Sequence, residues 1–416
     1  MIDICCTGKE LTVKAPPSKS VFHRELIVNY ILGARGDYLL SSEGDSNDIK
    51  ATKECLAALA DSADGEDIIL PARESGSTLR FMIPVALALT GGNNRLIFKT
   101  EGRLIERPLE ELSDCLAPHG ISISKDKENN AVICTGKLAP GRYVIDGSVS
   151  SQYISGLLMA LSFFEEGSSV EVTGKISSVH YIELTTGVLA KYGMNVALEN
   201  NVYTIPGRPA GKTATGDFEV EGDWSNGAFL LCLGSLIKDG GVKVEGLEPD
   251  SAQGDKKITE FLSGLGIDVK FGDGIMETGC SAEKTAVSDI TMECDDIPDI
   301  VPYMAVTGAF YAKKTVLKGT ARLRIKESDR VAAVTGMLAS CGIRAEADED
   351  SITVYGVVPA DVPEEISLTS SGDHRMAMSA VLLAAGLGKK VSLDDISCLD
   401  KSFPAFREIV EREMML

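Results

Sequence analysis

The 416-residue chain is long enough for two or three domains, each able to bury its own core. Its 61 acidic and 41 basic residues give a formal net charge of −20, which disfavours binding to nucleic acids and to anionic membranes. Ten cysteines without a CxxC pair and four widely separated histidines argue against disulfides and a metal site. The N-terminal sequence has neither a signal nor a transit pattern and no apolar stretch reaches membrane-spanning length, so we expect a cytoplasmic protein.

One kind of helix start recurs along the chain at nearly regular intervals. Each example is a turn of small or polar residues that runs into an apolar stretch rich in Ala and Leu. The starts are marked by Ser18, Gly76, Ser150, Trp224, Asp299 and Asp373, which are 58, 74, 74, 75 and 74 residues apart. This regular spacing indicates an internal repeat of six units.

A second kind of helix alternates with the first and passes through a glycine into a strand. The clearest examples end at Gly120, Gly193, Gly266 and Gly342, each at the position expected just after a helix. Alternating runs such as YVIDG and VKVEG supply the strands before the helices of the first kind. Each unit therefore has two helices and about four short strands. Six such units form a solenoid or two closed domains of three, and we favour two domains because solenoid repeats are shorter.

Polar residues are concentrated at these helix starts, where unpaired N–H groups and the helix dipole favour anions. Basic residues placed there in an acidic chain would converge if the two halves faced each other, which predicts a site for a ligand with several negative charges. Asp299 and Glu327 lie among them and are the natural candidates for proton transfer. Taken one at a time, each motif also reads as an ordinary helix cap or a solvated charged turn.

Nine segments together resemble a known family. In chain order they are PSKSVFHR, SGSTLR, GRLIERPLEEL, DGSVSSQYISGLLMA, SSVHYIELT, IPDIVPYMA, LRIKESDR, SGDHRMAM and DKSFPAF. Over essentially the whole chain they resemble the 5-enolpyruvylshikimate-3-phosphate synthase family. The resemblance implies an α/β (α+β) fold of two similar domains joined by a two-stranded hinge, each domain having three βαβαββ units with buried helices and outer mixed sheets. The implied domains are 18–222 and 1–17 plus 223–416.

The resemblance also implies a reaction. The enolpyruvyl group of phosphoenolpyruvate would pass to the 5-hydroxyl of shikimate 3-phosphate through a tetrahedral ketal, with release of phosphate, in the biosynthesis of chorismate and aromatic amino acids. Neither a cofactor nor a metal is implied. The expected partners are these two small molecules, with no nucleic acid or membrane, and the expected state is a monomer whose domains close on the substrates.

Site residues are implied where this chain matches the family motifs. The first domain, 18–222, is expected to hold shikimate 3-phosphate, and the second is expected to supply most phosphoenolpyruvate and proton-transfer groups. The catalytic set is Lys19, Asp299, Glu327 and His374. The set for shikimate 3-phosphate is Lys19, Ser20, Arg24, Ser150, Ser151, Gln152, Ser178, Tyr181, Asp299 and Lys326. The set for phosphoenolpyruvate is Lys19, Gly76, Arg107, Gln152, Arg330, Arg375 and Lys401.

The chain departs from the family pattern at a few positions, and rival readings remain. The departures are Glu74, Ser77, Val179-His180 and Arg322. An acid at Glu74 is expected to weaken phosphoenolpyruvate binding unless it pairs with an arginine. The rivals are UDP-N-acetylglucosamine enolpyruvyl transferase, an RNA 3′-terminal phosphate cyclase, which the charge of −20 disfavours, and a non-catalytic module that binds a phosphorylated metabolite.

Overall fold

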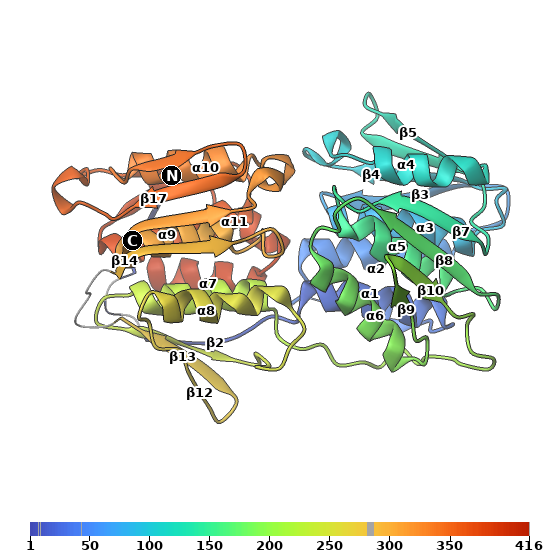
Figure 1. Ribbon diagram of the computed structural model, residues 1–416, viewed down its shortest axis with the longest axis horizontal. Coiled ribbons are helices and arrows are strands. Elements are labelled where there is room, and N and C mark those ends of the chain that lie inside the picture. The colour runs from blue at the N-terminus through green and yellow to red at the C-terminus, as the bar shows by residue number, and fades with distance from the viewer. Residues whose placement is uncertain (7, 9, 43, 281–286, 416) are drawn as a thin grey trace. The chain divides into compact units, whose positions relative to one another are not determined.

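The computed structural model describes residues 1–6, 8, 10–42, 44–280 and 287–415. The chain divides into two compact units (Figure 1). Unit 1 comprises Met1–Ser18 and Glu221–Leu416, and unit 2 comprises Lys19–Val220. Each unit has its own hydrophobic core. None of the helices that the structure describes combines the length and the apolar character needed to cross a membrane.

The helices of the first kind form the interior of each unit. They are α1 (Lys19–Ile31), α3 (Gly76–Leu89) and α5 (Ser151–Leu161) in unit 2, and α7 (Trp224–Leu236), α9 (Val301–Tyr311) and α11 (His374–Leu387) in unit 1. Every residue of α7 is buried. Gly156 lets α5 approach α3 closely, because a Cβ there would lie 2.8 Å from the carbonyl oxygen of Arg80. These helices are buried over most of their length because protein surrounds them.

The helices of the second kind lie nearer the surface of each unit. They are α2 (Asn47–Ala60), α4 (Glu110–Leu116), α6 (Val179–Lys191), α8 (Ile258–Gly264), α10 (Arg330–Ser340) and α12 (Pro404–Ile409). The four predicted glycine ends are confirmed. Gly120, Gly193, Gly266 and Gly342 have φ values of 75°, 84°, 75° and 72°, a left-handed conformation that favours glycine after a helix.

Four sheets of four strands repeat one topology. In unit 2 they are β3 (Asp67–Arg73), β4 (Arg95–Thr100), β6 (Ala131–Thr135) and β5 (Ser122–Asp126), and β7 (Arg142–Asp146), β8 (Ser168–Thr173), β10 (Val202–Ile205) and β9 (Ala197–Glu199). In each of these sheets the first two strands are parallel and the others add antiparallel. This is the βαβαββ order that the family resemblance implies.

Unit 1 builds its sheets from both ends of the chain. One contains β12 (Lys270–Gly272), β13 (Ile275–Gly279), β11 (Gly241–Glu245) and β2 (Glu10–Lys14), and another contains β14 (Val287–Glu293), β15 (Ala312–Lys318), β17 (Ser351–Tyr355) and β16 (Ala345–Ala347). A third contains β1 (Ile2–Ile4), β19 (Val391–Leu393) and β18 (Ser367–Leu368). Strand β2 pairs in parallel with β11 across more than two hundred intervening residues. The mixed α/β class is as expected.

The first and the sixth of the six predicted units depart from the expected four strands, and the sheet of the sixth has only the three strands β1, β19 and β18. Among the described residues from 15 to 66 there are two helices, α1 and α2, a short 3₁₀ turn at Asp37–Leu39 and no strand. The N-terminal strands β1 and β2 that precede α1 pair instead with β19 and β11 of unit 1. Where the chain passes from unit 1 to unit 2 and back, Ser18 N donates to Glu221 O at 2.7 Å and Asp223 N donates to Pro16 O at 2.8 Å.

Candidate active site

Arg24 is a buried cation in unit 2. Its Nε donates to Thr185 Oγ1 at 2.7 Å, and its Nη2 donates to the carbonyl oxygen of Tyr181 at 2.8 Å and to Ser155 Oγ at 3.3 Å. Burial lowers the pKa of Arg24 to about 9. No carboxylate of the described chain forms an ion pair with it. A buried guanidinium held by neutral groups is a strong receptor for an anion, because its charge is not otherwise balanced.

Gln152 is held in one orientation at the start of α5. Its Oε1 accepts from Arg80 Nη1 at 2.8 Å, and its Nε2 donates to Ser77 Oγ at 2.8 Å. Arg80 also donates from Nη2 to the carbonyl oxygen of Pro108 at 3.3 Å. Ser77 and Arg80 of α3 therefore fix the side-chain amide of Gln152. Arg80 also connects this amide to Pro108, the residue that follows Arg107.

Gly76 and Arg107 are in close contact in unit 2. Gly76 is the first residue of α3, and a Cβ there would lie 2.5 Å from Nη1 of Arg107. The guanidinium therefore occupies the space that any other side chain at position 76 would need. A backbone helix start beside a guanidinium is a site that suits a phosphate or a carboxylate.

The serines expected to bind shikimate 3-phosphate are at the starts of α5 and α6. Ser150 caps α5 and accepts from Gln152 N at 3.3 Å, and Ser151 is the first residue of that helix. Ser178 is buried and adopts a left-handed conformation, with φ of 55° and ψ of 54°. This conformation costs a non-glycine residue about 1 kcal/mol, and strain of this kind is concentrated at binding sites. Tyr181, in the first turn of α6, is half-buried.

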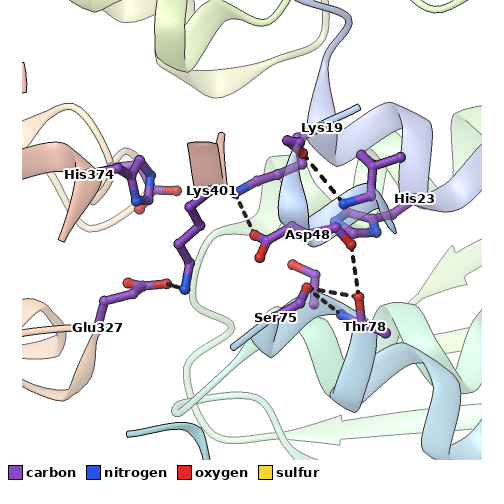
Figure 2. Close-up of polar contacts among 12 residues, drawn as sticks. Lys19, His23, Asp48, Ser75, Thr78, Glu327, His374 and Lys401 are labelled. Atoms are coloured by element: carbon purple, nitrogen blue, oxygen red, sulfur yellow. Dashed lines mark hydrogen bonds and ion pairs between the residues drawn. The ribbon is translucent and has the colours of Figure 1, made fainter. Parts of the chain in front are cut away.

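Lys19 pairs with an acid that the sequence analysis did not assign. Its Nζ lies 2.8 Å from Asp48 Oδ2, and the carbonyl oxygen of Asp48 accepts from Thr78 Oγ1 at 3.3 Å (Figure 2). Thr78 Oγ1 also lies 2.8 Å from Ser75 Oγ, which accepts a hydrogen bond from Thr78 N at 3.2 Å. The contacts tie the start of α1 to those of α2 and α3.

Arg330 is the centre of the charged cluster in unit 1. Its Nη1 lies 2.7 Å from Asp299 Oδ1, its Nη2 lies 2.9 Å from Glu327 Oε2, and its Nε lies 2.8 Å from Asp373 Oδ2. Lys401 Nζ lies 3.8 Å from the other oxygen of Glu327 (Figure 2). The two expected proton carriers, Asp299 and Glu327, are thus held by one guanidinium.

The electrostatics of this cluster favour an ionised Asp299. Burial alone would raise its pKa, but the charges of Lys326, Arg330 and Arg375 outweigh burial and hold the pKa well below its ordinary value. Lys326 Nζ lies 3.6 Å from Asp299 Oδ1. Burial lowers the pKa of Lys326 to about 8, although Asp299 opposes the shift.

Arg375 and His374 are both buried at the start of α11. Arg375 Nη1 donates to the hydroxyl of Tyr303 at 2.9 Å, and Tyr303 and Asp299 raise the pKa of Arg375 against the effect of its burial. His374 Nδ1 lies 3.6 Å from Asp373 Oδ1. Arg375 therefore remains charged at all accessible pH values.

The predicted site residues are divided between the two units. Lys19, Ser20, Arg24, Gly76, Arg107, Ser150, Ser151, Gln152, Ser178 and Tyr181 belong to unit 2, and Asp299, Lys326, Glu327, Arg330, His374, Arg375 and Lys401 belong to unit 1. Some residues that hold them had no assigned role, among them Asp48, Arg80, Thr185, Tyr303 and Asp373. Arg80 lies near the start of α3, and this position could have marked it as a candidate site residue. Thr185 lies inside α6, where no sequence pattern distinguishes it. The described residues contain no group of acids, cysteines and histidines arranged to bind a metal.

Solved structures define the fold class. The chain aligns with an EPSP synthase from Acinetobacter baumannii at a TM-score of 0.72, with 22% identity over 99% of this chain and 98% of that one. It also aligns with the enolpyruvyl transferase NikO from Streptomyces tendae at a TM-score of 0.69, with 18% identity over 99% of this chain and 97% of that one. The two alignments establish the fold that enolpyruvyl transferases share.

Sequence relatives define the family. Residues 8–410 match the family model described as EPSP synthase (3-phosphoshikimate 1-carboxyvinyltransferase). A 3-phosphoshikimate 1-carboxyvinyltransferase of Clostridium kluyveri is 33% identical, over 98% of this chain and 96% of the relative, and one of Clostridioides difficile is 30% identical, over 95% and 93%. The chain belongs to the EPSP synthase family. The resemblance and the prediction of an enzyme are confirmed, and the relatives do not favour the UDP-N-acetylglucosamine alternative.

Proposed function

We propose that this chain transfers the enolpyruvyl group of phosphoenolpyruvate to the 5-hydroxyl of shikimate 3-phosphate and releases phosphate. The 5-hydroxyl oxygen adds to C2 of phosphoenolpyruvate while a proton adds to C3, which gives a tetrahedral ketal. The C2–O bond to phosphate then breaks, and a proton leaves the C3 methyl group to restore the double bond. The observation that carries the proposal is the joint fixation of Asp299 and Glu327 by Arg330.

Shikimate 3-phosphate is assigned mainly to the residues of unit 2. Arg24 is its principal cation, because it is buried and its contacts are to neutral groups. The contacting set is Lys19, Ser20, Arg24, Ser150, Ser151, Gln152, Ser178, Tyr181, Asp299 and Lys326. Hydroxyl groups suit the ring hydroxyls of this substrate, and the cations suit its phosphate and carboxylate.

Phosphoenolpyruvate is assigned to the cations around Gly76 and at the starts of α10 and α11. The contacting set is Lys19, Gly76, Arg107, Gln152, Arg330, Arg375 and Lys401. Nη2 of Arg330 donates to both Glu327 Oε2 and Asp373 Oδ1, at 2.9 and 3.4 Å, whereas Nη1 carries a second N–H beside the one given to Asp299, and this N–H can contact an anion. The cations stabilise the charge of the departing phosphate, which is the largest electrostatic demand of the reaction.

Three groups move protons in this proposal. Asp299 takes the proton of the 5-hydroxyl, Glu327 exchanges the proton at C3, and Lys19 assists the leaving phosphate. His374 and Lys326 complete the polar surroundings. The enzyme acts as a cytoplasmic monomer, and neither a metal nor a cofactor enters any step.

The test is phosphate release from the two substrates, measured for the unaltered chain and for Glu327→Gln. The glutamine keeps the shape of the side chain and its contact to Arg330 but carries no exchangeable acid, so kcat should fall at least about a hundredfold. Glu349→Gln, at an exposed acid, is the matched control and should leave kcat unchanged. Calorimetry should show that Glu327→Gln still binds shikimate 3-phosphate. If the unaltered chain binds both substrates without releasing phosphate, it is a non-catalytic binding module and the proposal fails.

A further inference from the structure

Arg107 lies in a turn of unit 2 whose backbone is fixed on both sides of its side chain. The turn runs from Arg107 to Glu110, between the 3₁₀ helix η2 (Leu104–Glu106) and α4. Arg107 N donates to the carbonyl oxygen of Leu104 at 3.2 Å. The carbonyl oxygen of Arg107 accepts from Lys125 Nζ, on β5, at 2.9 Å. Both peptide groups that flank the Arg107 Cα are therefore held by hydrogen bonds.

Side chains also hold the rest of this turn. The carbonyl oxygen of Pro108 accepts from the hydroxyl of Tyr153 at 2.5 Å. Leu109 N donates to Glu110 Oε2 at 2.8 Å, and the other carboxylate oxygen of Glu110 lies 3.3 Å from Lys125 Nζ. Strand β5 lies beside α4, which brings Lys125 to the turn (Figure 1). Lys125 therefore contacts the turn at both its first and its last residue.

We propose that Lys125 is a positioning residue that holds Arg107 where it receives phosphoenolpyruvate. This inference rests on the proposed function, in which Arg107 contacts that substrate. The Lys125 side chain is only 19% exposed, so water competes little for its ammonium, and a charged donor makes a stronger hydrogen bond than a neutral one. The contact fixes the backbone from which the long side chain of Arg107 extends. The guanidinium therefore stays beside Gly76, at a position that leaves no room for a Cβ there.

Lys125 can be changed without altering the contacts of another assigned site residue. Arg80 also donates to this turn, but it holds Gln152 as well, so its loss would disturb two parts of the site. The contacts of Lys125 are to Arg107 and Glu110, which both belong to the turn. A substitution of Lys125 therefore tests the turn itself.

Lys125→Met tests the inference, because methionine keeps most of the apolar stem but cannot donate a hydrogen bond. Steady-state kinetics should show a rise of about fivefold in KM for phosphoenolpyruvate, with little change in KM for shikimate 3-phosphate. Lys125→Arg keeps a charged donor and should hold KM for phosphoenolpyruvate within about twofold of the unaltered value. Lys127→Met, at an exposed lysine two residues further on, is the matched control and should change neither constant. Equal values of KM for phosphoenolpyruvate in Lys125→Met and Lys127→Met overturn the inference.

A double-mutant cycle shows whether Lys125 acts through Arg107. In Arg107→Ala no guanidinium is left to position, so the addition of Lys125→Met should change KM for phosphoenolpyruvate by less than about twofold. A purely structural role of Lys125 would weaken binding equally in both backgrounds. A rise of about fivefold in the Arg107→Ala background would therefore show that Lys125 acts by another route, and the inference would be wrong.

Hydrogen exchange separates this inference from the proposed function, because it needs no substrate. Mass spectrometry should show faster deuterium uptake in residues 104–116 of Lys125→Met than in the unaltered chain or in Lys127→Met, since the turn has lost an anchor. If uptake is faster and the unaltered chain releases no phosphate, the proposed function fails and Lys125 still anchors the turn. If phosphate is released and Lys125→Met changes neither uptake nor KM, the inference fails alone. Unchanged uptake overturns the inference whether or not phosphate is released.

Discussion

Nη1 of Arg107 occupies the position beside Gly76 where a side chain would begin, 2.5 Å from an ideal Cβ. Gly76 is helical and has no positive φ, so backbone conformation does not require glycine there. The requirement comes from the guanidinium. The pair forms one surface, in which a helix N-terminus and a cation lie together.

Gly76→Ala should push Arg107 away from the helix start and weaken phosphoenolpyruvate binding. Loss of one charged contact predicts that KM for phosphoenolpyruvate rises about tenfold, with little change in KM for shikimate 3-phosphate. Steady-state kinetics with each substrate varied in turn measures both constants. Gly187→Ala is the matched control, because this helical glycine has no atom within 4 Å of its Cβ position. Equal values of KM for phosphoenolpyruvate in the two variants would contradict the contact.

Thr185→Val should weaken shikimate 3-phosphate binding without changing the size of the side chain. It removes the oxygen that accepts from Arg24 Nε at 2.7 Å, so the buried guanidinium loses one of the groups that orient it. A hydrogen bond to a charged group is worth about 1.5 kcal/mol, which predicts a rise in KM for shikimate 3-phosphate of roughly tenfold. Thr186→Val, at the next residue, should leave this constant unchanged. A larger effect on phosphoenolpyruvate than on shikimate 3-phosphate would argue against the assignment of Arg24.

Lys326 should cause substrate binding to depend on pH in the alkaline range. Its pKa of about 8 means that the ammonium loses its proton as pH rises past that value, and its attraction for an anion is lost with the proton. KM for shikimate 3-phosphate should therefore increase above about pH 8. In Lys326→Arg the side chain stays charged, so KM should remain level past pH 8 and should increase only toward pH 9, where Arg24 begins to lose its proton. The same alkaline rise in both proteins would show that another group is responsible.

Alanine substitutions at Gly266 and Gly342 should distinguish the cost of a strained backbone conformation from the cost of a steric clash. Gly266→Ala places a side chain at a φ of 75° with open space around it, and should lower the free energy of unfolding by about 1 kcal/mol. Gly342→Ala has a similar φ of 72°, but its Cβ would also collide with the carbonyl oxygen of Asp361. Its melting temperature should therefore fall further than that of Gly266→Ala. Equal melting temperatures for the two variants would show that the backbone at Asp361 can shift away from the new side chain without loss of stability.

The sequence predicts local features of this molecule well, because they depend on neighbouring residues. The glycine ends of α8 and α10 and the helix starts at Gly76 and Ser150 are of this kind. Contacts between distant segments were not predictable. Asp48 beside Lys19 and Thr185 beside Arg24 depend on how helices pack, and a threonine inside a helix has no distinguishing pattern. By sequence Lys125 resembles Lys127, and only its contact with the carbonyl oxygen of Arg107 makes it unusual.

The chain leaves unit 1 after Ser18 and returns to it at Glu221, and this order has a consequence for synthesis on the ribosome. All of unit 2 has been translated, with its own core, before β11 exists to pair with β2. Strand β1 can pair only later still, because its partner strand β19 lies near the C-terminus and is translated last. The half that carries Arg24 can therefore fold during translation, whereas the half that carries Asp299 and Glu327 is completed only when nearly the whole chain has been made.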